Sequence, residues 1–148
     1  MLKISSKLTI TKQLFLSGLT LLTTTAVLNI SLVQSAGAQT SSIINVNNTK
    51  VAGGSTTPGA TNWQPYNGTI AGVFVDVNTS GAGFTATPNY ITSIAGNSNH
   101  WETTGASAVY FPTARGFRVY VRFYDGRPLT PAFANQNQWR INWMGIGR

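Results

Sequence analysis

The residues best able to do chemistry are few, and three of them adjoin at His100-Trp101-Glu102: the only histidine, one of four tryptophans and one of three acidic residues. They follow Gly96-Asn97-Ser98-Asn99, a composition typical of a loop. A ring flanked by hydrogen-bonding groups suits a sugar, whose apolar face stacks on the ring while its hydroxyls need donors and acceptors. We therefore take His100, Trp101 and Glu102 as candidate ligand-binding residues. The structural alternative is that Trp101 folds back onto the core.

A second group of chemically useful residues lies in Tyr124-Asp125-Gly126-Arg127. A turn at this point presents a ring, a carboxylate and a guanidinium together, so Tyr124, Asp125 and Arg127 are further candidate ligand-binding residues. Asp-Gly also favours a hairpin turn whatever the function, which is the structural alternative here.

The rest of the composition excludes most catalytic classes. With no cysteine and one histidine, the chain cannot build a disulfide framework, a thiolate metal site or a cysteine nucleophile. A glycosidase needs two carboxylates that converge across a cleft, and the chain holds only Asp76, Glu102 and Asp125. We expect no catalytic residues, no metal and no cofactor, and therefore a protein that is not an enzyme.

The N-terminal segment has the pattern of a targeting signal. Lys3, Lys7 and Lys12 precede an uncharged apolar run over residues 14–33, and Ala36-Gly37-Ala38 supplies the small residues of a cleavage site. The sequence predicts a signal peptide over 1–38 and a secreted or cell-surface protein, with the periplasm as a further location. The alternative is an uncleaved membrane anchor. The remaining chain has seven basic and three acidic residues, a net charge of +4.

Residues 39–62 are rich in Ser, Thr, Asn and Gly and have no aromatic residue. This composition predicts a flexible leader before a folded domain over 63–148. As an alternative, the short apolar pairs Ile43-Ile44 and Val51-Ala52 form an edge strand.

From residue 63 onward the signals are those of strands separated by turns. The clearest strand covers 116–124, where Phe117, Val119, Val121 and Phe123 alternate with Arg118, Tyr120, Arg122 and Tyr124. In the last strand Trp139, Ile141 and Trp143 share one face. The other predicted strands are 69–77, 88–95 and 106–111. Together they predict an all-β domain, a small antiparallel β-sandwich of about six strands.

The polar face of the strand over 116–124 has several interpretations. Arg115-Gly116-Phe117 followed by alternating aromatics is similar to an RNA-binding strand, but the next positions do not fit and no βαββαβ pattern surrounds them. We expect no nucleic-acid partner. The arginines and tyrosines of this face are predicted to line solvent or a subunit interface.

The order of these features resembles the H-type lectin domain. The resemblance covers 77–147 and rests on Phe84-Thr85-Ala86-Thr87-Pro88 before a strand, on Gly116-Phe117 opening a strand that ends in Tyr124-Asp125, and on Trp143 in a closing strand. It implies a trimeric six-stranded sandwich that binds galactose-type sugars at subunit edges. His100-Trp101-Glu102 then occupies the place of the family's sugar-contacting arginine, and Tyr124-Asp125 that of its aromatic binding turn.

Three function classes follow in order of preference. The first is an exported, non-catalytic carbohydrate-binding domain that self-associates and has no membrane partner after signal cleavage. The second is a structural or adhesive cell-surface subunit that uses Arg118, Tyr120, Arg122 and Tyr124 for contacts between chains. The third is a glycan-acting enzyme.

Overall fold

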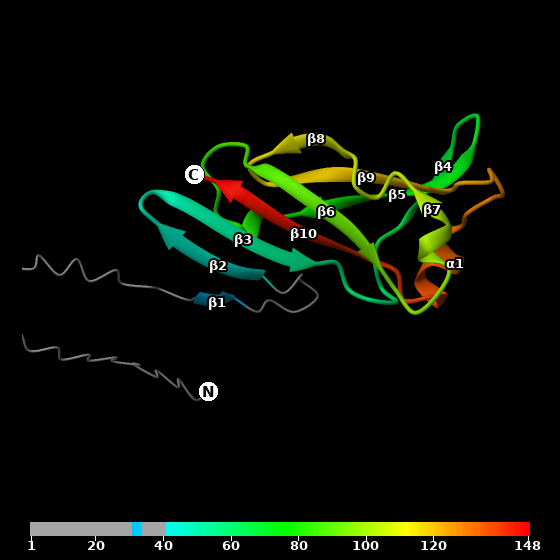
Figure 1. The fold of residues 1–148 in the computed structure, drawn as a ribbon, viewed down its shortest axis with the longest axis horizontal. Coiled ribbons are helices and arrows are strands. Elements are labelled where there is room, and N and C mark those ends of the chain that lie inside the picture. The colour runs from blue at the N-terminus through cyan, green and yellow to red at the C-terminus, as the bar shows by residue number, and fades with distance from the viewer. Residues whose placement is uncertain (1–30, 34–40) are drawn as a thin grey trace, which may run out of the picture.

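A computed structural model describes residues 31–33 and 41–148, which form two antiparallel β-sheets with one short helix (Figure 1). The first sheet contains, in spatial order, β1 (Ser31–Val33), β2 (Ser41–Val46), β3 (Thr49–Ser55), β10 (Arg140–Gly147) and β6 (Asn89–Ala95). The second contains β4 (Gln64–Asn67), β5 (Ala71–Asn78), β9 (Gly116–Phe123) and β7 (Thr103–Thr104), and β8 (Val109–Thr113) also pairs with β9. The prediction of an all-β fold is confirmed, with more strands than the sequence indicated.

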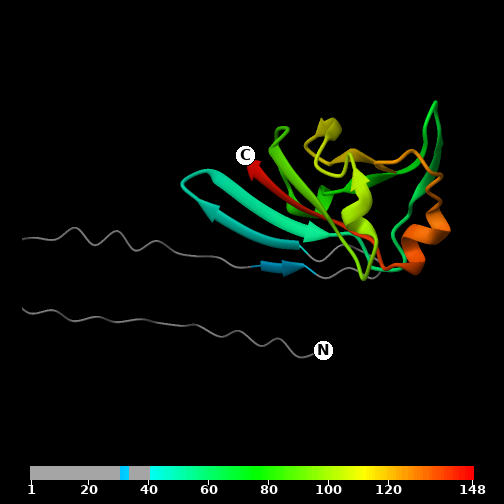
Figure 2. The ribbon, with the colours of Figure 1, turned by 45° about the vertical axis from the view of Figure 1, so that its right-hand side comes forward.

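The hydrophobic core lies between the two sheets (Figures 1 and 2). In β9 the side chains alternate strictly, so that Phe117, Val119, Val121 and Phe123 are buried. In the first sheet Ile141 and Trp143 of β10 are buried, together with Trp139 just before the strand. The period-two assignment of both segments is therefore confirmed.

Tyr90 of β6 links the two sheets through its ring and its hydroxyl. The ring centroid lies 4.5 Å from that of Phe117, and the hydroxyl donates a 3.0 Å hydrogen bond to the Thr113 carbonyl of β8. The Thr79 hydroxyl lies 2.7 Å from the Tyr90 hydroxyl oxygen and donates to it, because the Tyr90 proton is directed at Thr113. Burial raises the pKa of Tyr90, so the phenol stays neutral and keeps its donor.

Residues 41–55 differ from the sequence-based expectation. The prediction of a flexible leader is wrong for this segment, because β2 and β3 form a hairpin and β3 also pairs with β10 from Lys50–Gly147 to Ser55–Asn142. The hairpin turn is Asn47-Asn48, both with positive φ, which asparagine tolerates better than most residues. Ala52 is buried in the core, so β3 is an interior strand of the sheet.

The predicted signal peptide over 1–38 lies outside the described residues except for Ser31–Val33, which pair with β2 as strand β1. Within the described part of the chain, no helix combines the length and the apolar character needed to cross a membrane.

Two short 3-10 helices, η1 (Ser80–Ala82) and η2 (His100–Glu102), and the helix α1 (Pro131–Gln136) complete the fold. Thr130 caps α1 by accepting a 3.2 Å hydrogen bond from the Phe133 amide, and Pro131 begins the helix where no amide donor is needed. The Phe133 ring packs edge-on against Phe123 and Trp139. A helix of six residues is too short for hydrophobic periodicity to reveal it.

The pairing of β3 generates a stability prediction. Ala52→Asp places an uncompensated charge in the core and is expected to cost at least about 3 kcal/mol in urea unfolding. Thr49→Asp, an exposed position in the same strand, is the matched control and is expected to change little. Equal stability of the two variants contradicts a structural role for β3.

Candidate functional site

The structure brings the two groups of sequence-predicted site residues together. We call His100, Trp101, Glu102, Tyr124, Asp125 and Arg127 the Arg127 cluster. The Arg127 guanidinium forms an ion pair with Glu102 and a second one, at 3.2 Å, with Asp125. The Tyr124 amide donates a 3.0 Å hydrogen bond to the Glu102 carbonyl. Pairing of β7 with the end of β9, at Thr103–Phe123, positions both segments.

The charged side chains of the Arg127 cluster form ion pairs with one another. The Arg127 guanidinium carbon lies 3.9 Å from the centroid of the Phe123 ring, so one face of the group is stacked while its edge donates to two carboxylates. This arrangement holds η2 against the turn that follows β9. The cluster is thus a structural clamp in addition to any binding role.

The aromatic members of the cluster point to solvent. Trp101 is 76% exposed and Tyr124 is 65% exposed, so Trp101 does not fold back onto the core. The His100 Nδ1 atom is buried and has no hydrogen-bond partner in the part of the chain that the structure describes. The assignment of these residues to a ligand site stays a prediction.

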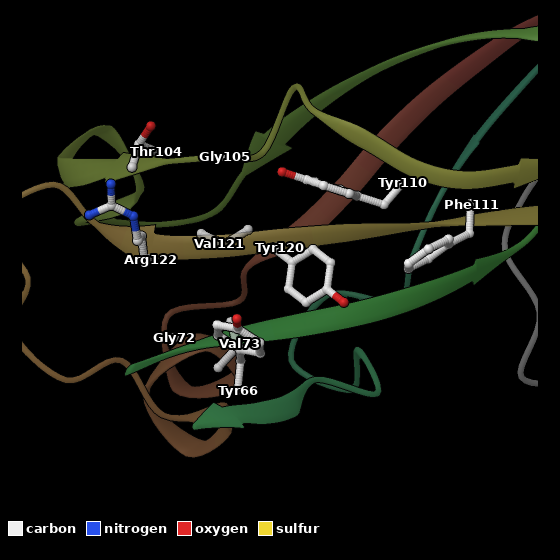
Figure 3. A pocket seen from close by; sticks show the side chains of 10 residues that line it. All are labelled: Tyr66, Gly72, Val73, Thr104, Gly105, Tyr110, Phe111, Tyr120, Val121 and Arg122. Atoms are coloured by element: carbon white, nitrogen blue, oxygen red, sulfur yellow. The ribbon is translucent and has the colours of Figure 1, made fainter. Parts of the chain in front are cut away.

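A groove of about 530 Å³ lies on the outer face of the second sheet (Figure 3). We call it the tyrosine groove. Figure 3 shows Tyr110 and Tyr66 on opposite sides of Tyr120, with Arg122 toward one end and Phe111 toward the other. The residues that line it are Tyr66, Gly72, Val73, Thr104, Gly105, Tyr110, Phe111, Tyr120, Val121 and Arg122.

Strand register explains the shape of the groove. Tyr120 of β9 is packed edge-on by Tyr110 of β8, at 4.9 Å between centroids, and by Tyr66 of β4, at 5.2 Å. Tyr66 pairs with Gly72 of β5, which has no side chain. A Cβ at Gly72 would lie 2.6 Å from the Val121 carbonyl oxygen, closer than real contacts allow. The glycine therefore permits the close approach of β5 and β9 at this point.

Phe111 is held in an unusual backbone conformation at the edge of the groove. Its φ is +51°, in the left-handed region that a bulky residue rarely adopts, and its side chain is 68% exposed. The pairing of β8 with β9 is irregular between Tyr110 and Thr113, as in a β-bulge. Bulges redirect side chains beside functional sites, and strain of this kind concentrates there.

An ion pair across β5 and β9 orders the surface beside the groove. Arg118 donates two hydrogen bonds of 2.7 Å to Asp76, its direct cross-strand neighbour, and stacks on Phe74 at 4.1 Å from the ring centroid. It also donates to the Tyr120 hydroxyl at 3.3 Å. The hydrogen bonds from Arg118 lower the pKa of the Asp76 carboxyl, and those to Asp76 and Tyr120 raise the pKa of Arg118.

Sequence reasoning identified only part of the tyrosine groove. Arg118, Tyr120 and Arg122 do lie on the outer face of β9, as their alternation predicts. Tyr66 and Phe111 were not among the candidate residues, because they come from segments far apart in the sequence. The available signal was the number of aromatic residues at positions outside the core pattern of predicted strands.

Comparison of the chain with family models, with curated proteins and with solved structures gives no match. Among the described residues no group of three or more His, Cys, Asp and Glu side chains is arranged to hold a metal ion. The groove and the Arg127 cluster are therefore the two features of the described residues that bear on function.

The Arg118–Asp76 pair predicts a pH dependence. Because the folded-state pKa of Asp76 is lowered from 3.8, the pair stabilises the fold above that value and its contribution is lost as the pH falls through the lower folded-state pKa. In a carboxyl NMR titration, Arg118→Gln is expected to raise the Asp76 midpoint toward 3.8. Arg122→Gln, which makes no contact with Asp76, is the control; equal midpoints in the two variants contradict the assignment.

Proposed function

We propose that the chain is an exported, non-catalytic carbohydrate-binding domain with a β-sandwich fold, as its resemblance to the H-type lectins suggests. The observation that carries the proposal is the tyrosine groove, an open hollow lined by Tyr66, Tyr110, Phe111 and Tyr120. Aromatic side chains offer apolar faces for the C–H faces of sugar rings, and tyrosine adds a hydroxyl for hydrogen bonding. The volume lies within the range of small-molecule sites.

The strands and ring contacts that hold the groove residues in place favour binding of a ligand to a preformed surface. Tyr66, Tyr110 and Tyr120 lie on three paired strands, and each ring has an aromatic neighbour that restricts its movement. A site held on paired strands needs less ordering when a ligand binds, which favours affinity. Thr104 and Arg122 supply polar groups at one end of the groove.

The distribution of carboxylates favours binding without chemistry. The lining of the tyrosine groove contains no Asp or Glu. Glu102 and Asp125 both form ion pairs with Arg127, and Asp76 forms one with Arg118. A glycosidase pair requires one acid that protonates the leaving group and a second that acts on the opposite side of the bond. The three carboxylates are instead arranged as partners of arginine.

A structural or adhesive cell-surface subunit is the second candidate, and one observation favours it. On the first sheet, large apolar side chains are exposed where β2, β6 and β10 present alternate residues outward; they are Ile44, Val46, Ile91, Met144 and Ile146. Exposed apolar patches often mark contacts between proteins. Self-association through this face is compatible with a sugar site on the other sheet.

Glycan binding by single variants is expected to show whether the ligand binds the tyrosine groove or another surface of the domain. Tyr110→Ala removes an exposed ring from the groove and is expected to lower affinity for a bound glycan at least tenfold, which corresponds to about 1.4 kcal/mol. The melting temperature is expected to change little because Tyr110 is 44% exposed. Ile91→Ala, on the outer face of the other sheet, is the control. Binding is measured on a glycan array and then by calorimetry.

Three other results would assign a different site or a different function to the domain. Loss of binding in Trp101→Ala and Asp125→Ala but not in Tyr110→Ala assigns the site to the Arg127 cluster. Assembly without any glycan binding supports the structural subunit. Weaker assembly in Ile91→Ala assigns the contact to the first sheet, and weaker assembly after the double replacement of Arg118 and Arg122 with Ala assigns it to β9. Hydrolysis of a reporter glycoside that is lost in Glu102→Gln contradicts the non-catalytic assignment.

A further inference from the structure

Every acidic side chain in the chain forms an ion pair with one of two arginines, Arg118 or Arg127. The sequence contains three acidic residues, and each lies within the described part of the chain. Asp76 binds Arg118, while Glu102 and Asp125 both bind Arg127. No side-chain carboxylate is therefore left for the remaining cationic side chains.

Two of those remaining cations lie in hollows on the outer face of the second sheet. Arg122 lines the tyrosine groove. Arg115 lines a second hollow of about 320 Å³, formed with Asn78, Thr113 and the Arg118–Asp76 pair. Phe111 lines both hollows, so the two adjoin at its exposed ring. Asp76, the one carboxylate in either lining, is neutralised by Arg118.

The spacing along β9 makes this surface a track. Arg122, Tyr120 and Arg118 project from the same face at alternate positions, and at about 3.3 Å per residue the Cα atoms of Arg122 and Gly116 are about 20 Å apart. Arg115 immediately precedes Gly116 and so lies at the far end. The track has a cation without a carboxylate partner at each end and aromatic rings between them. Its length of about 20 Å matches several linked sugar rings rather than one.

From this arrangement, and on the basis of the proposed function, we infer that the ligand is an anionic polysaccharide laid along β9. Sugar rings stack on Tyr110, Tyr120 and Phe111, and the negative groups of the polymer accept hydrogen bonds from Arg122 and Arg115. Guanidinium forks match carboxylate and sulfate groups well, and pairing with a charged partner roughly doubles the strength of a hydrogen bond. The strained backbone at Phe111 then serves to hold its ring between the two hollows.

Matched polymers test the charge requirement. The first pair is polygalacturonate and its fully methyl-esterified form, and the second is dextran sulfate and dextran. Affinity electrophoresis and calorimetry of the full chain are expected to show binding of the charged member of at least one pair, at least tenfold tighter than its neutral counterpart. This preference is expected to fall as salt rises from about 0.05 to 0.5 M, because salt screens exposed charges. The pair that shows it identifies carboxylate or sulfate as the recognised group.

Arginine variants test whether the charged polymer binds along β9. Arg122→Gln and Arg115→Gln are each expected to weaken binding of the charged polymer at least tenfold, because each removes hydrogen bonds from a guanidinium to a charged group of the polymer. Arg140→Gln makes the same change in net charge on the first sheet and is the control, with little effect expected. An equal loss in all three variants means attraction by net charge alone and overturns the proposed track.

Two further outcomes separate this inference from the proposed function. Equal binding of the charged and neutral members of both pairs overturns the anionic ligand but leaves carbohydrate binding intact. No binding of any of the four polymers, together with a negative glycan array, removes both. Tighter binding of oligo(dT) than of every charged polysaccharide also overturns the inference, because stacked rings beside arginines suit single-stranded nucleic acid too.

Discussion

The rest of the structure depends on the alternation of side chains in β9. Four residues of this strand, at alternate positions from Phe117 to Phe123, fill the core between the sheets, and the intervening Arg118, Tyr120 and Arg122 form the outer surface. A register shift of one residue would exchange the two sets, exposing the core side chains and burying two guanidinium groups. Because burying an unpaired charge is costly, the core fixes the register, and the register fixes the groove. The rings that line the groove therefore gain their positions from the packing on the opposite face of the same sheet.

The same constraint explains how a chain with so few charged residues distributes them. Arg118 and Asp76 face each other across β9 and β5, and Arg127 holds Glu102 and Asp125 at the end of β9. Exposed ion pairs contribute little to stability on their own, but both arginines also lie over aromatic rings, which orders the guanidinium planes. The pairs thus fix local geometry at two points along the strand. The groove lies between these two points, and its own arginine, Arg122, makes no ion pair with any described residue.

Sequence patterns predicted the elements whose side chains alternate cleanly and failed where composition imitates a loop. The buried residues of the strand over 116–124 and of the final strand were identified because aromatic and β-branched side chains recur there with period two. The segment that forms the β2–β3 hairpin has the composition of a flexible leader, since Gly53 and Gly54 and many Ser and Asn residues are typical of a spacer. In the fold the neighbouring strands supply the interactions that this segment lacks by itself: β3 forms backbone hydrogen bonds with strands on both sides, and only Ala52 is buried. Such stabilisation is long-range and leaves no local pattern.

The candidate site shows the same contrast between local and distant information. Sequence reasoning started from scarce residue types that stand close together, and the structure does bring His100-Trp101-Glu102 next to Tyr124, Asp125 and Arg127. These charged residues, however, also have a structural role. The carboxylates of Glu102 and Asp125 both form ion pairs with Arg127 and so are less available to a ligand. The tyrosine groove instead draws Tyr66, Tyr110, Tyr120 and Arg122 from three separate strands, and none of these is unusual in its own segment. Because the three acidic groups pair with Arg118 and Arg127, the proposed binding of a ligand depends on the aromatic rings and on Arg115 and Arg122, which form no ion pair with any described residue. The rings come from β4, β8 and β9, and both arginines lie on or directly before β9, where sequence alone indicated only an alternating polar face.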